Sequence, residues 1–159
     1  MKLFRALAVI ALIIWMVFIY SLSADTAPQS NAKSGRIVTA VVKILYPDFD
    51  EMSQDRQTEI TDKISFAIRK LAHFTIYAVL GALSFLSFIT YNKIPIKIRY
   101  LIILAVGLLC SASDEYHQTF IYGRSGEIRD IVIDFSGVLL AVIIFGLMSK
   151  HKIIKKYIE

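Results

Sequence analysis

Long apolar runs alternate with polar segments along the whole chain. The apolar runs cover about residues 6–22, 66–90, 100–120 and 130–148. Each run is close to the ~20 residues that an α-helix needs to cross the hydrocarbon core of a bilayer. The pattern therefore predicts an all-α, polytopic membrane protein, in which a single domain over residues 1–159 forms a bundle of four transmembrane helices.

The first apolar run permits two interpretations. Lys2 and Arg5 precede it and small residues follow it, as in a cleavable signal peptide. The bulky side chains of Phe18, Ile19 and Tyr20 stand near the cleavage position and favour a helix that is retained instead. The segment that follows lies on the same side of the membrane in either case.

We predict a long outer loop after the first helix. Residues 23–34 are rich in Ser, Ala and Asn and are expected to be irregular, whereas residues 36–46 fit a short helix on the membrane surface. Pro47 ends that helix, and the acidic residues 48–62 favour a second membrane helix that begins before the bilayer. The loop either covers the surface or forms a lid over a polar site.

The composition narrows the class of protein. Hydrophobic residues make up 56% of the chain and the mean hydropathy is +0.59, which exceeds that of an ordinary soluble domain. Cys110 is the only cysteine, so the sequence holds no disulfide framework and no multi-cysteine metal site. The net charge of +5 comes from basic residues beside the membrane spans, so we expect no nucleic-acid partner.

The basic residues that flank the spans also predict an orientation. Nine of the 18 basic residues share short segments with only one of the 13 acidic residues, and basic short segments mark the cytoplasm. We therefore expect a multi-pass protein of the cell membrane with both termini in the cytoplasm and two loops outside. The nine residues are Lys2, Arg5, Lys93, Lys97, Arg99, Lys150, Lys152, Lys155 and Lys156.

Polar residues gather where three of the spans meet the expected outer surface. Ionisable groups at the margins of membrane spans are costly, so their presence suggests a function. Within each span they recur at spacings of three or four residues and so share a helix face. The sets are Lys70, His73 and Tyr77; Asp114, Glu115 and Gln118; and Asp130 and Asp134.

Electrostatics favours a single site that contains all three sets. Four carboxylates in one partly dry layer would repel one another unless cations reach them. Arg124 lies on the short loop between the last two spans, and its forked guanidinium can grip a carboxylate or a phosphate. The alternative is a salt-bridge network that only braces three helices.

The order of these residues resembles the VanZ-like family. The motifs are Arg-Lys-x-x-His-Phe-x-x-Tyr, Asp-Glu-x-x-Gln-x-Phe, Gly-Arg-x-Gly and Asp-x-x-x-Asp-x-x-Gly, at residues 69–77, 114–120, 123–126 and 130–137. The resemblance spans nearly the whole chain. It implies a polytopic bacterial membrane protein related to low-level teicoplanin resistance, and it supplies no biochemical mechanism.

Two positions depart from the family pattern. Tyr122 stands where the family often has Pro before the Gly-Arg pair, and Asp134 stands where Asn is common. Asp134 therefore adds a carboxylate to the expected site.

The first functional hypothesis is a binding module. A polar pocket facing outside would hold an anionic lipid headgroup or a lipid-linked envelope precursor, with Arg69 as a further cation. This would affect how a lipid-anchored glycopeptide, such as teicoplanin, meets the surface. The proposed binding residues are Lys70, Tyr77, Gln118, Arg124, Asp130 and Asp134.

The second hypothesis is a membrane-embedded hydrolase or transferase that acts on a lipid-linked substrate. His73 with Asp114 or Glu115 would then serve as general base and orienting partner. A metal-dependent variant would use these three residues and Asp134, and one histidine among oxygen ligands suits a hard cation better than zinc.

The residues assign neither a cofactor nor a metal, and they leave open whether the chain forms a homo-oligomer. A third hypothesis, a proton or ion pathway, is disfavoured because the inner halves of the last three spans are apolar.

Overall fold

Five α-helices and one short 3-10 helix make up the part of the chain that the structure describes. The computed structural model describes residues 2–89, 91 and 93–149. No strand occurs among these residues. The elements are α1 (Lys2–Ser23), α2 (Ala27–Leu45), η1 (Phe49–Glu51), α3 (Gln54–Phe88), α4 (Ile96–Gln118) and α5 (Ile128–Ser149).

Four of the described helices, α1, α3, α4 and α5, are long and apolar enough to cross a membrane. Large apolar side chains remain exposed on them, such as Leu7, Leu109 and Ile143. In a membrane these side chains would face lipid. The predicted all-α, polytopic fold is therefore confirmed, although α4 ends at Gln118 rather than near residue 120.

The segment after α1 differs from the predicted loop. Residues 27–34 were expected to be irregular, but they form the first two turns of α2. A capping box explains the early start, since the Thr26 backbone N–H donates to Gln29 Oε1 at 2.9 Å and Thr26 Oγ1 accepts from the Gln29 backbone N–H at 3.5 Å. The helix predicted for residues 36–46 is thus the second half of a longer one.

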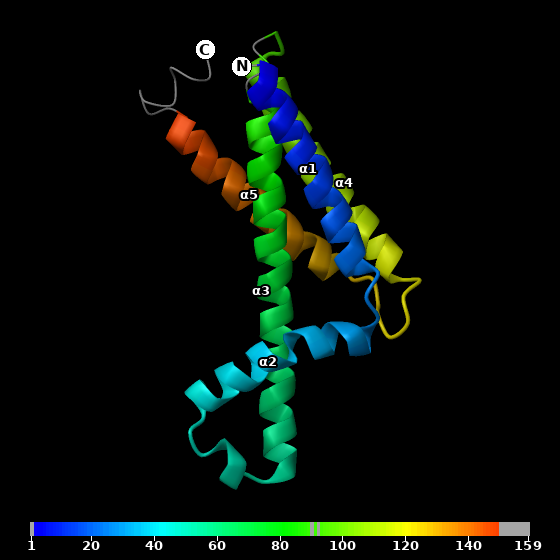
Figure 1. The fold of residues 1–159 in the computed structure, drawn as a ribbon, viewed down its shortest axis with the longest axis vertical. Coiled ribbons are helices and arrows are strands. Elements are labelled where there is room, and N and C mark those ends of the chain that lie inside the picture. The colour runs from blue at the N-terminus through cyan, green and yellow to red at the C-terminus, as the bar shows by residue number, and fades with distance from the viewer. Residues whose placement is uncertain (1, 90, 92, 150–159) are drawn as a thin grey trace.

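Helix α3 is the central element and extends well beyond a bilayer core. Its 35 residues span about 52 Å at 1.5 Å per residue, against a hydrocarbon core of about 30 Å. This confirms that the second membrane helix begins before the predicted span. Helix α2 lies across the extending half of α3, where Val38, Val42 and Ile60 form a small buried cluster (Figure 1).

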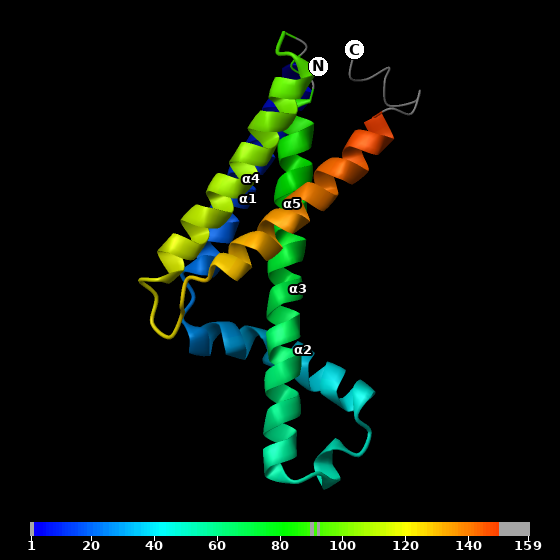
Figure 2. The ribbon, with the colours of Figure 1, turned by 180° about the vertical axis from the view of Figure 1, so that it is seen from behind.

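The other membrane helices pack around the second half of α3. Figure 2 shows α5 crossing α3 obliquely, while α1 and α4 lie beside each other, meet α3 near its last turns and diverge from it toward its middle. The shared core contains Tyr77 and Leu80 of α3, Ile103 of α4 and Val138 of α5. Trp15 of α1 donates from its indole Nε1 to the Ile76 carbonyl oxygen at 3.0 Å, which ties α1 to α3.

Small residues let α3 and α5 approach closely, as is common where helices pack in membranes. A Cβ at Gly137 would collide with the Phe74 carbonyl oxygen and lie 3.0 Å from the Ala78 nitrogen. A Cβ at Gly81 would lie 2.8 Å from the Val138 carbonyl oxygen. The two backbones therefore touch at two points along the crossing.

This contact predicts the effect of a single methyl group. Gly137→Ala should lower the free energy of unfolding by about 1–3 kcal/mol, because neither backbone can yield without separating the helices. Thermal unfolding in detergent measures the loss. Gly35→Ala is the matched control, since no atom lies within 4 Å of a Cβ there, and its stability should stay level or rise by up to about 1 kcal/mol. Equal stability of the two variants would contradict the tight crossing.

Candidate functional site

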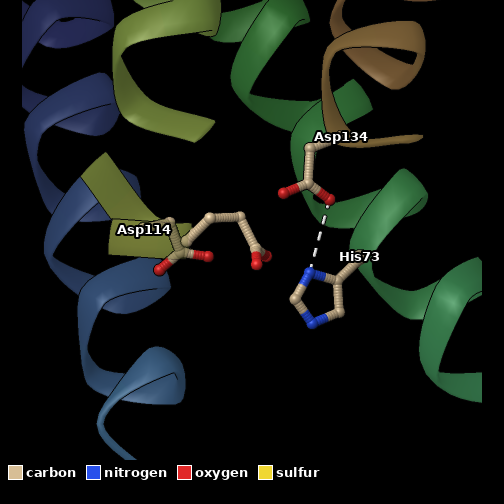
Figure 3. Close-up of side chains that lie close together, drawn as sticks. His73, Asp114 and Asp134 are labelled. Atoms are coloured by element: carbon tan, nitrogen blue, oxygen red, sulfur yellow. Dashed lines mark ion pairs between the residues drawn. The ribbon is translucent and has the colours of Figure 1, made fainter. Parts of the chain in front are cut away.

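Polar side chains from three helices converge beside the crossing of α3 and α5. The polar cluster consists of His73 from α3, Asp114 and Glu115 from α4, and Asp134 from α5. One nitrogen or oxygen atom from each of the four lies within 4.8 Å of those from the others. Figure 3 shows His73, Asp114 and Asp134 pointing into a common space. The structure thus brings together the polar sets of three separate spans.

The cluster is largely shielded from solvent. Asp134 is fully buried, Glu115 is 2% exposed and Asp114 is 7% exposed. The His73 side chain is 25% exposed and lies at the open edge. Buried carboxylates are unfavourable unless hydrogen bonds or opposite charges compensate for lost water, so their partners decide what the site can do.

Glu115 and Gln118 link the cluster to the loop between α4 and α5. Glu115 Oε2 accepts a hydrogen bond from the Glu127 backbone N–H at 2.9 Å. The Gln118 amide nitrogen donates to Asp114 Oδ2 at 3.2 Å and to Glu115 Oε1 at 3.4 Å. One amide therefore holds two carboxylates that lie three and four residues earlier on the same helix.

Arg124 acts on the cluster through Gln118 rather than directly. Its Nη1 donates to Gln118 Oε1 at 3.2 Å, and its Nε donates to the Asp25 carbonyl oxygen at 3.2 Å. Within the described residues it forms no ion pair with a carboxylate. Gly123 precedes it with a φ of +74°, a left-handed conformation that favours glycine. Arg124 therefore ties the loop to the linker between α1 and α2.

Lys70 and Asp130 form a separate ion pair beside the cluster. Their side chains are 19% and 13% exposed. The Lys70 ammonium also lies 5.0 Å from the centroid of the Phe66 ring. Both residues were expected to belong to one site with His73, but they neutralise each other instead.

Asp134 has two neighbours from other helices. Ser111 Oγ donates to its Oδ2 at 3.3 Å. His73 Nδ1 lies 3.3 Å from its Oδ1, although this oxygen accepts no hydrogen bond (Figure 3). Asp114 Oδ1 is likewise buried and accepts no hydrogen bond. Two carboxylate oxygens inside the cluster therefore accept no hydrogen bond, although Asp134 Oδ1 forms an ion pair with His73.

A cavity of about 240 Å³, here called the α2 pocket, lies between α1, α2, α3 and α4. His73, Tyr77, Asp114 and Gln118 reach it from the cluster side. Tyr77 also donates to the Cys110 carbonyl oxygen at 3.4 Å and so links α3 to α4 within the core. The cluster therefore opens into the α2 pocket through His73 and Asp114.

The pocket also contains charged residues that the sequence analysis missed. Lys33 and Asp25 line it and form an ion pair at 2.6 Å. Arg69, which the sequence analysis offered as a further cation, lines it too and donates to Asn31 Oδ1 at 3.5 Å. Asp25 is 99 residues from Arg124 in the chain, so no spacing pattern could have revealed that contact.

The Arg124 contacts predict that lysine is a poor substitute. In Arg124→Lys one ammonium replaces the fork that reaches both Gln118 and the Asp25 carbonyl oxygen. Amide hydrogen exchange in residues 24–27 and 119–127 should accelerate by about tenfold, as expected for the loss of one hydrogen bond to a charged group. Arg129→Lys is the matched control because its 60% exposed side chain contacts only Glu127 and the Phe66 ring among the described residues and reaches neither Gln118 nor Asp25. Unchanged exchange in Arg124→Lys would show that the loop is held by other contacts.

The family comparison agrees with the arrangement of these residues. Neither the curated proteins nor the solved structures contain a significant match to the chain. A family model described as VanZ/LLP1 matches residues 8–149, which is most of the chain. The match covers most of α1, the other three membrane helices and the whole polar cluster. It confirms the resemblance expected from the four ordered motifs: the chain is a membrane protein that belongs to the VanZ/LLP1 family.

Proposed function

We propose that this protein binds an anionic lipid or a lipid-linked envelope component in the α2 pocket. The observation that carries the proposal is the mixed lining of the pocket. Three basic side chains, those of Lys33, Arg69 and Arg124, lie with four isoleucines around one cavity. The isoleucines are Ile19, Ile37, Ile68 and Ile76.

Two of the three cations are available to an anion. Lys33 is paired with Asp25, whereas Arg69 and Arg124 form no ion pair within the described residues. A guanidinium presents several donors in a fixed fork that matches the oxygens of a phosphate or carboxylate. The pocket therefore favours an anionic group that can displace weak contacts such as the 3.5 Å bond from Arg69 to Asn31.

The size of the cavity favours a headgroup over a whole lipid. A volume of about 240 Å³ lies below the range for drug-sized ligands, so acyl chains would remain outside the pocket. Exposed apolar side chains on α2, including Ile37 and Ile44, fit a helix that lies at the membrane surface. The headgroup of a lipid would thus bind in the α2 pocket, and its acyl chains would contact the apolar side chains of α2.

The proposal places the pocket on the outer side of the membrane. The loop between α3 and α4 and the first turn of α4, which carry Lys93, Lys97 and Arg99, lie at the opposite end of the bundle from α2, beside the N-terminus (Figure 1). Basic short loops favour the cytoplasm, so α2 would face outside. In this orientation a bound envelope component could change how teicoplanin, a glycopeptide with a lipid anchor, meets the surface, as the family name implies.

The hydrolase or transferase alternative lacks an activated nucleophile in the part of the chain that the structure describes. Within the described residues, no serine, threonine or cysteine side chain hydrogen-bonds to His73. An activated nucleophile beside its base is the usual geometric sign of covalent catalysis. Lipid binding therefore remains the better-supported function.

Lipid retention tests the proposal. Arg69→Gln should lower the amount of anionic lipid that co-purifies with the full chain by about tenfold, because a charge-assisted contact of about 1.5–3 kcal/mol is lost. Mass spectrometry of the extracted lipids measures it, and Arg124→Gln should act in the same direction. Lys63→Gln is the control, since Lys63 is 71% exposed on α3 and does not line the pocket. Equal retention in all variants would refute the binding role.

Survival in teicoplanin tests the link to resistance. Where expression of the protein raises survival, Arg69→Gln should remove that gain and Lys63→Gln should keep it. If Arg69→Gln loses the co-purifying lipid but keeps full survival, resistance does not depend on lipid binding.

Labelling from outside tests the orientation. In a Cys110→Ala background, Ser125→Cys on the exposed loop between α4 and α5 should react with a membrane-impermeant maleimide added to intact cells. Lys97→Cys, exposed at the start of α4 at the other end of the bundle, should react only after the cells are opened. The reverse pattern would place the pocket in the cytoplasm.

A further inference from the structure

We propose that the polar cluster of His73, Asp114, Glu115 and Asp134 binds one divalent cation that prefers oxygen ligands, with Mn²⁺ as its best fit. This site is separate from the cationic side of the α2 pocket. It requires no lipid and goes beyond the proposed binding function.

The spacing of the four side chains fits a single ion. Their potential ligand atoms all lie within 4.8 Å of one another. Hard divalent cations bind oxygen at about 2.0–2.6 Å, so ligands on opposite sides of one ion stand about 4–5 Å apart. His73 Nδ1 and Asp134 Oδ1 form an ion pair at 3.3 Å, a separation that two adjacent ligands of one ion would also have.

Two buried oxygens that accept no hydrogen bond point independently to a ligand, and Asp114 Oδ1 is the one of the two without an ion pair to His73. Asp114 is 7% exposed and Asp134 is fully buried, yet Oδ1 of each accepts no hydrogen bond. Buried carboxylate oxygens almost always have partners, and leaving one without a partner is costly. The two side chains come from α4 and α5 and face each other across the space that His73 also enters (Figure 3). One cation in that space would satisfy both.

The charge of the cluster is not balanced by the basic residues nearby. Lys70 is already paired with Asp130, and Arg124 contacts Gln118 and a carbonyl oxygen. His73 alone stands beside three carboxyl groups. A divalent cation supplies the missing positive charge, which a dry carboxylate layer requires in order to stay ionised.

The remaining oxygens of the cluster are held in place by neighbours. Gln118 donates to Asp114 and Glu115, the Glu127 backbone N–H donates to Glu115, and Ser111 donates to Asp134. Outer hydrogen bonds of this kind orient ligating side chains in metal sites. Each carboxylate is thus anchored through one oxygen or more while lone pairs remain free to bind.

The ligand types decide which ion fits best. Carboxylates suit Mg²⁺, Ca²⁺ and Mn²⁺, whereas softer ions prefer more nitrogen or sulfur. Paired helices that carry glutamate and histidine hold iron or manganese in carboxylate proteins, so one imidazole among three carboxylates favours Mn²⁺. His73 and Asp114 both line the α2 pocket, which gives the ion a route to the cluster from outside the helices.

Metal binding by the purified full chain tests the inference directly. After treatment with EDTA, titration with MnCl₂ in detergent should remove the free Mn²⁺ signal in electron paramagnetic resonance until one ion is bound per chain. Asp134→Asn and Asp114→Asn should each weaken binding by at least about tenfold, as expected for the loss of one ligand charge. Asp130→Asn is the matched control, because Asp130 lies one turn from Asp134 on α5 and belongs to the Lys70 pair.

Thermal unfolding separates ligation from a merely structural role. Wild type should unfold at a higher temperature with Mn²⁺ than without it, since a ligand that binds only the folded state stabilises it. Without metal, Asp134→Asn should unfold no earlier than wild type, because the repulsion that it removes among three carboxylates offsets the loss of the His73 ion pair. Mn²⁺ should no longer stabilise this variant. A large loss of stability in metal-free Asp134→Asn would instead favour a structural role.

The inference is overturned if wild type binds Mn²⁺, Mg²⁺, Ca²⁺ and Zn²⁺ no better than the Asp114→Asn, Asp134→Asn double variant. Protons would then neutralise the cluster. Lipid retention by Arg69→Gln, measured with EDTA present, is scored separately, so failure of the metal site and failure of the lipid site remain distinguishable.

Discussion

The backbone contact between α3 and α5 is the constraint on which the arrangement of the site depends. Gly137 has no side chain, so the Phe74 carbonyl oxygen can approach it directly. His73 precedes Phe74 by one residue, and Asp134 precedes Gly137 by three. The crossing therefore fixes the distance between an imidazole and a carboxylate that belong to different membrane spans. A looser crossing would leave Asp134 buried with no partner on α3, which is costly in a dry environment.

Helix α4 supplies the rest of the site through its last turns. Asp114, Glu115 and Gln118 fall on one face because they are spaced by three and four residues. Two of them also form hydrogen bonds outside the helix: Glu115 holds the loop that leads to α5, and Gln118 reaches Arg124. The end of α4 thus binds the loop that leads to α5 and, through Arg124, the linker between α1 and α2. The same hydrogen bonds leave lone pairs of the carboxylates facing the cavity.

The sequence was sufficient to predict the four spans and the gathering of polar residues from three of them, because the length of an apolar run and the spacing along a helix are local properties. It was misleading for residues 27–34, where Ser and Asn suggested irregular structure although Thr26 and Gln29 already formed a capping box. Lys70 illustrates a second limit: it shares a helix face with His73, yet its long side chain turns to Asp130. Contacts of this kind depend on the angle at which α3 and α5 cross. The sequence pattern of a single helix carries no information on that angle.

Asp25 connects α2 to the polar cluster through a chain of hydrogen bonds. Its carboxylate accepts from Lys33 on α2, and its carbonyl oxygen accepts from Arg124, which in turn holds Gln118. Gln118 donates to two carboxylates of the cluster. A group that enters the α2 pocket and attracts Lys33 or Arg124 must therefore compete with contacts that also position α2 and the cluster. Occupancy of the pocket and the position of α2 are linked through this chain of hydrogen bonds, so the helix that covers the site also takes part in it.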